Sequence, residues 1–150
     1  MFIQNFLHYN NLDKPHLKAV LRVRKLTIKT CKRMPKNLRY VITNSLLELA
    51  KDATVYCMKA ENIILSAELN IDEFKFRQGC LQQASSSLMA LQEEVAFLYS
   101  LMELGNTCFR NKEEYDLIFD KWFAAIKQAH KLVNNVYIND KVTIKKMKGI

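Results

Sequence analysis

The sequence predicts an all-α protein, folded as an up-down-up-down four-helix bundle. Its 150 residues fit one ordinary domain, and a chain of this length buries roughly two-thirds of the surface that it exposes when unfolded. Only three Gly and two Pro occur, so the chain has few places to turn. Four long stretches also place apolar residues at alternating steps of three and four, which is the period of a helix with one buried face.

The first helix is expected from Pro15 to about Arg33. An Asp just before a helix can cap its free amides, and Pro is tolerated in the first turn, so Asp13 and Pro15 indicate a helix start. The segment MPKN at 34–37 then breaks the helix. The stripe expected to face the bundle is Leu17, Val20, Leu21, Ile28 and Cys31.

The second helix is expected from about Lys36 to Leu69, and the third from Asp72 to Leu104. Asn70 to Asp72 forms the turn between them, and Gly105 with Asn106 ends the third helix as C-cap residues do. Apolar or small residues follow the helical period through both segments. Short turns between such helices favour antiparallel neighbours in a bundle.

The fourth helix is expected to start at Asn111, where Asn111 and Glu114 resemble a capping box with Asn in place of Ser or Thr. Its core stripe runs from Tyr115 to Val136. We therefore divide the chain into an N-terminal arm (1–14), the four-helix bundle (15–136) and a basic C-terminal tail (137–150). Within the tail, polar and apolar residues alternate briefly in KVTIK at 141–145, as they do in a strand.

Positive charge is concentrated in the first helix. The chain carries a net charge of +8, yet residues 14–39 hold ten basic and no acidic side chains, whereas residues 40–135 hold nine basic and thirteen acidic ones. At 100° per residue, six of these cations fall on one continuous face, and two more continue it beyond the helix. This basic ridge consists of Lys18, Arg22, Lys25, Lys29, Lys32, Arg33, Lys36 and Arg39.

A solvated surface usually mixes signs of charge, so the basic ridge favours a polyanion site over mere solubility. Phosphates bound there would release counterions and give an affinity that falls steeply with salt. Aromatic residues do not alternate with the cations of the helix, which argues against recognition of stacked single strands. The tail lysines, Lys141, Lys145, Lys146 and Lys148, provide either a second contact or a disordered solubility tail.

Several apolar residues lie away from the expected core stripes. They are Ala19, Val23 and Leu26 in the first helix, Met89, Ala96 and Phe97 in the third, and Phe119 and Phe123 in the fourth. Exposed apolar surface of this kind usually marks partner contacts, and we expect a homo-oligomer, a docked protein or both. The alternative is that the helices cross at angles that place these residues in a wider core.

The sequence gives little indication of an enzyme. Cys31, Cys57, Cys80 and Cys108 form no CxxC pair, and His8, His16 and His130 offer no zinc spacing, so we expect buried free thiols, no metal and no cofactor. Di-iron bundles need paired ExxH motifs, and Asp13-x-x-His16 is one imperfect copy. All-α RNases place an Arg four to six residues from a His on one helix, and no Arg lies within such reach upstream of any His here.

The expected compartment is the cytoplasm, because MFIQNFLHYNN lacks the features of a signal peptide and no apolar run approaches membrane-spanning length. No membrane partner is expected.

The segments that follow the basic helix resemble a known family. MPKNLRYVITNSLLELAKDATVYCMKAEN is similar to the Pro-Lys-x-x-Arg/Lys-Tyr/Phe opening of helix two in small bacterial four-helix bundles. FRQGCLQQASSSLMALQEEVAFLYSLMELGNTCFRNKEEYDLIFDKWFAAIKQAHKLV looks like the same family's A-x-x-S-L-x-x-L pattern, Leu-Gly helix stop and Glu-Tyr start. The family comprises the 23S rRNA intervening-sequence proteins and the accessory variability determinant (Avd) proteins of diversity-generating retroelements. The resemblance covers roughly residues 15 to 136.

The strong basicity is more similar to the accessory variability determinants. This resemblance implies a barrel-shaped homopentamer that binds the retroelement's reverse transcriptase and its template RNA, and that assists mutagenic cDNA synthesis without catalysing it. From the basic ridge itself, we expect contacts with the phosphates of RNA or an RNA/DNA hybrid. The matching residues carry over only for the basic first helix with Lys36 and Arg39. The alternative is an intervening-sequence-type structural bundle without a direct nucleic-acid role.

Overall fold

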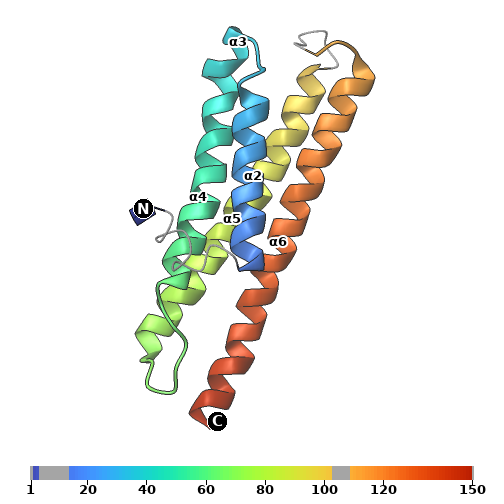
Figure 1. Ribbon diagram of the computed structural model, residues 1–150. Helices are drawn as coiled ribbons and strands as arrows, with labels where there is room; N and C mark the ends of the chain where they lie inside the picture. Colours follow the sequence, from blue (N-terminus) through green and yellow to red (C-terminus); the bar gives the residue numbers. More distant parts are fainter. Residues whose placement is uncertain (1, 4–13, 103–108, 150) are drawn as a thin grey trace.

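The protein is a bundle of four long helices that alternate in direction (Figure 1). The computed structural model describes residues 2–3, 14–102 and 109–149. The long helices are α2 (Pro15–Cys31), α4 (Asn44–Glu61), α5 (Ile71–Met102) and α6 (Lys112–Lys148), while the short α3 (Lys36–Leu38) and the π-helix η1 (Arg39–Thr43) connect α2 to α4. The described residues contain helices and no strand, which confirms the all-α prediction.

Each long helix packs against two neighbours, so that the four form a closed ring around one core. α2 contacts α4 and α6, and α5 contacts the same two helices from the other side. Trp122 of α6 is fully buried at the centre, together with leucines from the other three helices. The core residues of largest volume with almost no exposure are Leu17, Met34, Leu46, Leu81, Leu88, Leu91, Leu98, Met102, Trp122 and Ile126.

The buried face of α2 lies about a quarter-turn from the predicted stripe. Val23, which was assigned to an outer strip, is fully buried, whereas Ile28, assigned to the core, is 38% exposed. The reason is Thr27, whose hydroxyl accepts a hydrogen bond from the indole Nε1 of Trp122 at 3.0 Å and donates one to the carbonyl of Val23 at 2.7 Å. A hydroxyl whose donor and acceptor are both hydrogen-bonded can occupy a core position. The face of α2 that carries Thr27 and Val23 therefore lies toward the core.

The wider-core alternative holds for several of the other outlying residues. Phe119 is buried, and Ala19, Leu26 and Phe123 pack against the core. Met89 and Phe97 of α5 stay exposed, at 44% and 54%. The expectation of exposed apolar surface therefore survives on α5 and fails on α2.

The second helix ends eight residues before the predicted Leu69. α4 stops at Glu61, and residues 62–70 form an irregular connection. The cause is Arg77 of α5, whose Nη1 donates to the carbonyls of Ala60 at 2.9 Å and Ile63 at 3.0 Å. Carbonyls at a helix end need partners from outside the helix, and here a guanidinium supplies them. α5 then begins where Asn70 caps the amide of Glu73 at 2.8 Å.

The last helix extends well beyond the predicted core stripe. Asn111 is its N-cap and accepts from the amide of Glu114 at 2.9 Å, as the capping pattern predicted. α6 then continues to Lys148, so residues 137–148 are helical and the brief alternation at 141–145 is not a strand. Gly149 ends the helix with a φ of 70°, a left-handed conformation that suits glycine. Asp140 and Ile144 of this extension are buried.

Other expectations fall partly or wholly on residues outside the described ranges. Cys31, Cys57 and Cys80 are buried free thiols, as predicted, whereas Cys108 lies outside. The helix stop at Gly105 and Asn106 and most of the N-terminal arm, including Asp13, also lie outside.

Candidate nucleic-acid interface

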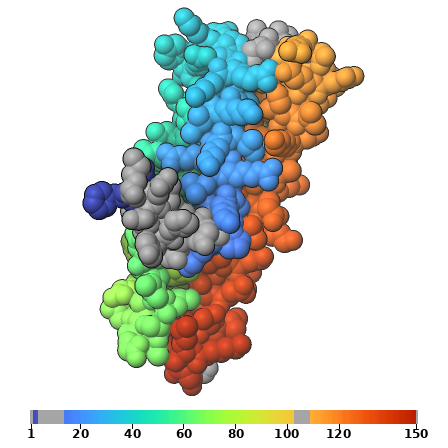
Figure 2. Space-filling model, viewed as in Figure 1, coloured from blue at the N-terminus to red at the C-terminus, as the bar shows by residue number. Residues whose placement is uncertain are grey.

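The basic ridge is exposed along its whole length. All eight of its cations are solvent-accessible, and the six on α2 and its end lie opposite the buried face formed by Leu17, Val20 and Val23. In the space-filling view, α2 runs along the middle of one face of the molecule (Figure 2). From Lys18 to Lys32 the helix rises about 21 Å, at 1.5 Å per residue. That span matches roughly six phosphates of one duplex strand, spaced about 3.4 Å apart along the axis.

Two members of the basic ridge have structural partners. The Nη2 atom of Arg33 lies 2.6 Å from Oε1 of Glu114, and its guanidinium lies 4.5 Å from the ring centre of Phe109. Arg39 donates to the carbonyls of Lys32 at 2.9 Å and Met34 at 3.0 Å. These contacts join the ends of α2, η1 and α6. The hydrogen bond and charge of Arg33, with the amide of Arg110, lower the pKa of the Glu114 carboxyl.

The six remaining cations form no ion pair within the part of the chain that the structure describes. They are Lys18, Arg22, Lys25, Lys29, Lys32 and Lys36. Neighbours three or four residues apart on a helix repel one another by a few tenths of a kcal/mol per like-charged pair. This uncompensated repulsion is what an anionic ligand would relieve.

A lysine from another helix adds to the ridge. Lys121 of α6 lines a hollow of about 260 Å³ with Lys29 and Arg33, floored by Leu26, Thr30 and Ile118. The sequence did not assign Lys121 to the site, because it lies about ninety residues from α2 in an unremarkable charge pattern. Only the packing of α2 against α6 brings it to the ridge.

The tail lysines have unequal roles. Lys148 donates to the carbonyls of Ala67 and Leu69, and thereby holds the end of α6 against the connection between α4 and α5. Lys141 lies 4.5 Å from the ring centre of Tyr137. Lys145 and Lys146 are exposed on the helical extension. The tail lysines are thus presented on a helix rather than on a disordered segment.

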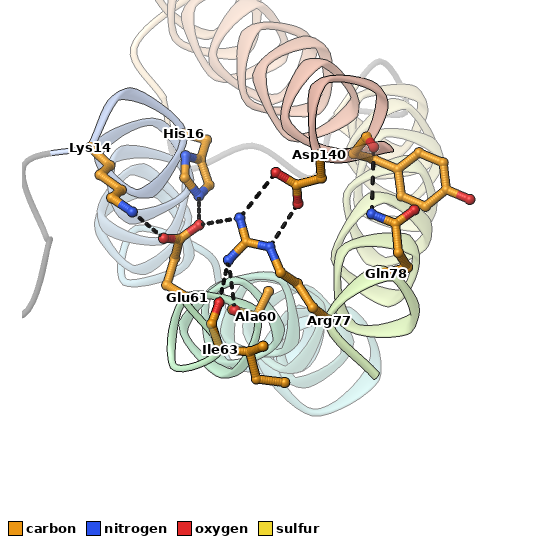
Figure 3. Close-up of polar contacts among 9 residues, drawn as sticks. Lys14, His16, Ala60, Glu61, Ile63, Arg77, Gln78 and Asp140 are labelled. Carbon is orange, nitrogen blue, oxygen red and sulfur yellow. Dashed lines mark hydrogen bonds and ion pairs between the residues drawn. The ribbon is translucent and has the colours of Figure 1, made fainter. Parts of the chain in front are cut away.

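A buried polar network crosses the bundle at the level where α2 begins (Figure 3). Glu61 lies at its centre. Its Oε1 is 2.9 Å from Nε2 of His16 and 3.3 Å from Nη2 of Arg77, and its Oε2 accepts from Lys14. Arg77 also binds Asp140 through two contacts, at 2.7 and 3.3 Å. The network therefore links α2, α4, α5 and α6.

Three partners, namely His16, Lys14 and Arg77, determine the charge state of Glu61. Burial alone raises the pKa of this carboxyl, but hydrogen bonds from His16 and Lys14 and the charge of Arg77 outweigh burial and lower the pKa to about 2. The side chains of His16, Glu61, Arg77 and Asp140 are all less than a tenth exposed. The network is consequently a buried structural network, in which each carboxylate has an ion-pair or hydrogen-bond partner.

The imperfect Asp13-x-x-His16 motif lies only partly within the described residues, because Asp13 is outside them. His16 contacts Glu61, and His130 is half-buried on α6. No group of three or more potential metal ligands occurs among the described residues. Burial raises the pKa of the Cys31 and Cys57 thiols to about 12, which opposes thiolate formation.

Comparison with known proteins gives no further assignment: no family model, no curated protein and no solved structure matches this chain. Within residues 2–3, 14–102 and 109–149, no helix has both the length and the apolar character needed to cross a membrane.

Proposed function

We propose that this protein is a non-catalytic, nucleic-acid-binding accessory factor of a diversity-generating retroelement. It partners a reverse transcriptase and its template RNA, or an RNA/DNA hybrid, during mutagenic cDNA synthesis, as a cytoplasmic homo-oligomer with five subunits expected. The observation that supports this proposal is the basic ridge, in which six exposed cations lack an ion pair within the described residues. The family resemblance supplies the polymerase partner.

The ridge suits phosphates rather than base edges. Its cations are spaced along one helix face like a row of phosphates, and six contacts would neutralise a short length of backbone regardless of sequence. Selectivity for one template would then come from the polymerase and its RNA. The mildly acidic remainder of the bundle leaves α2, with Lys121 and the end of α6, as the surface for the polyanion.

The test is a charge reversal with a matched control. The ridge variant carries Lys18→Glu, Arg22→Glu, Lys25→Glu and Lys29→Glu. The control reverses four exposed lysines on other helices, namely Lys51, Lys75, Lys127 and Lys131. Both variants change the formal charge equally, so only the location of the charge differs.

Filter binding of template RNA at low salt should show loss of retention by the ridge variant and near-normal retention by the control. Circular dichroism and light scattering should show the same helix content and oligomer for all three proteins. In a reconstituted reaction, only the ridge variant should fail to support cDNA synthesis by the reverse transcriptase. If the unmodified protein retains no RNA or DNA at low salt, the proposal is wrong, and an intervening-sequence-type interaction bundle is the better description.

A further inference from the structure

The end of the basic ridge opens onto a hollow between α2 and the segment that connects it to α4. The hollow has a volume of about 410 Å³, within the range of roughly 300–1,000 Å³ typical of small-molecule sites. Its lining combines apolar side chains, two cations and no acidic group: Ile28, Cys31, Lys32, Arg39, Tyr40, Thr43, Asn44 and Leu47. Lys32 and Arg39 belong to the ridge as well, so the two features are continuous.

The π-helix η1 gives this hollow an exposed aromatic ring. Tyr40 and Val41 are 83% and 75% exposed, although they follow each other directly, while Leu38 and Ile42 on either side are buried. Tyr40 makes no hydrogen bond or ring contact within the described part of the chain. A π-turn of this kind is rare in proteins and occurs frequently at functional sites.

Arg39 holds the backbone next to that ring. Its guanidinium donates to the carbonyls of Lys32 and Met34, and the hydroxyl of Thr43 donates back to the carbonyl of Arg39. η1 is therefore tied to the end of α2 through Arg39, while the bond from Thr43 stays within η1. The backbone that carries Tyr40 is thereby held next to the end of α2, where Lys32 lies.

We infer that this hollow binds an unpaired nucleobase of a single-stranded RNA, whose backbone follows the basic ridge. The base stacks on Tyr40 against the apolar wall of Ile28 and Leu47, while Lys32 and Lys36 hold the flanking phosphates. Positive charge without any lining carboxylate favours an anionic ligand over a neutral or basic one, and the exposed ring beside the cations favours a nucleotide among anions. The inference rests on the proposed function and names its ligand class. It differs from the sequence-based argument against stacked single strands, because Tyr40 lies beside the end of the ridge rather than among the cations of α2.

The experiment compares a short labelled single-stranded RNA with its blunt duplex, using fluorescence anisotropy at one low salt concentration. Tyr40→Ala should weaken single-strand binding by roughly 5- to 100-fold, the contribution of one base stacked on an aromatic ring. Duplex binding should stay unchanged, because paired bases cannot enter the hollow. Tyr40→Phe should retain stacking and bind as the unmodified protein does.

Phe76→Ala is the matched control, because Phe76 is also an exposed ring, at 56%, but lies on α5. It should leave both affinities unchanged. Ultraviolet cross-linking with the single strand, read by mass spectrometry, should modify Tyr40 and not Phe76.

The outcomes separate the inference from the proposed function. If RNA binding depends on the ridge but Tyr40→Ala changes nothing, or weakens strand and duplex equally, the base site is wrong and the proposed function stands. The same holds if Tyr40→Ala disrupts only self-association or polymerase binding, since the hollow is then a protein contact. If the unmodified protein binds neither RNA, both are wrong.

Discussion

Replacing Glu61 by Gln should strongly destabilise the bundle, because it removes the carboxylate that joins His16, Lys14 and Arg77. The substitution keeps the shape of the side chain and eliminates its charge. Breaking a buried ion pair by removing one partner costs about 3–5 kcal/mol. Arg77 retains its two contacts to Asp140, so we expect a loss of stability at the lower end of this range, about 3 kcal/mol. For a domain of this size each kcal/mol shifts Tm by roughly 2–4 °C, which predicts a fall of roughly 6–12 °C.

The assay is urea unfolding followed by far-ultraviolet circular dichroism, with thermal unfolding as a second readout. Glu48→Gln is the matched control, since Glu48 lies on the same helix, α4, but is exposed. The control should stay within about 0.5 kcal/mol of the unmodified protein. If Glu61→Gln also stays within that limit, the buried network does not contribute to stability as described above.

The pH dependence gives an independent check on the same residue. The pKa of Glu61 is lowered from an ordinary 4.5 to about 2, so its contribution to stability is fully present above pH 4.5 and is lost as pH falls toward 2. The shift corresponds to roughly 3 kcal/mol, which solvent near the half-exposed Lys14 reduces to about 2. The stability difference between the unmodified protein and Glu61→Gln should therefore shrink across this acid range. A difference that stays constant down to pH 2 would contradict the assignment.

Three further predictions concern single residues. Lys25→Glu turns the repulsion of Lys25 by Arg22 and Lys29, one turn away on either side, into attraction. It should raise the free energy of unfolding, measured in urea, by about 1 kcal/mol while weakening RNA binding. A loss of stability would contradict the repulsion described for the ridge. Thr27→Val leaves the indole N–H of Trp122 without its partner and should cost about 1–3 kcal/mol, whereas Thr27→Ser should cost less, and equal losses would count against the hydrogen bond. Burial, with smaller effects of nearby acidic groups, raises the pKa of the Cys57 thiol to about 12. Iodoacetamide at pH 8 should therefore modify Cys57 about 1,000-fold more slowly in the folded than in the unfolded protein, as mapped by mass spectrometry. Comparable rates would refute that burial.

The number and order of the long helices could be predicted from hydrophobic periodicity and from the scarcity of Gly and Pro. The exact buried face of α2 could not, because Thr27 occupies a core position through its bond to Trp122, ninety-five residues away in sequence. The end of α4 and the extension of α6 were missed for a related reason. Arg77 contacts both segments, since it binds a carbonyl at the end of α4 and the buried Asp140 of α6.

A signal for the buried network was nevertheless present in the sequence. Arg77 lies between Phe74 and Leu81 in the apolar phase of its helix, and Asp140 lies four residues before the buried Ile144. A charge in an apolar phase predicts a buried partner of opposite sign, but it does not identify that partner. The exposure of the basic ridge along α2, in contrast, follows from the periodicity of that helix alone, and its residues are exposed as predicted. Its hollows were not predictable, because they are built from segments that meet only in the folded chain.

The salt dependence of RNA affinity tests the central claim most directly, namely that the basic ridge neutralises phosphates. If the six unpaired cations each contact one phosphate, the logarithm of the binding constant should fall against the logarithm of salt with a slope of about −4 for a single strand and about −5 for a duplex. Reversing four of them should flatten the slope to about −2 or less. A slope near zero for the unmodified protein, or one that the ridge variant leaves unchanged, would contradict the account.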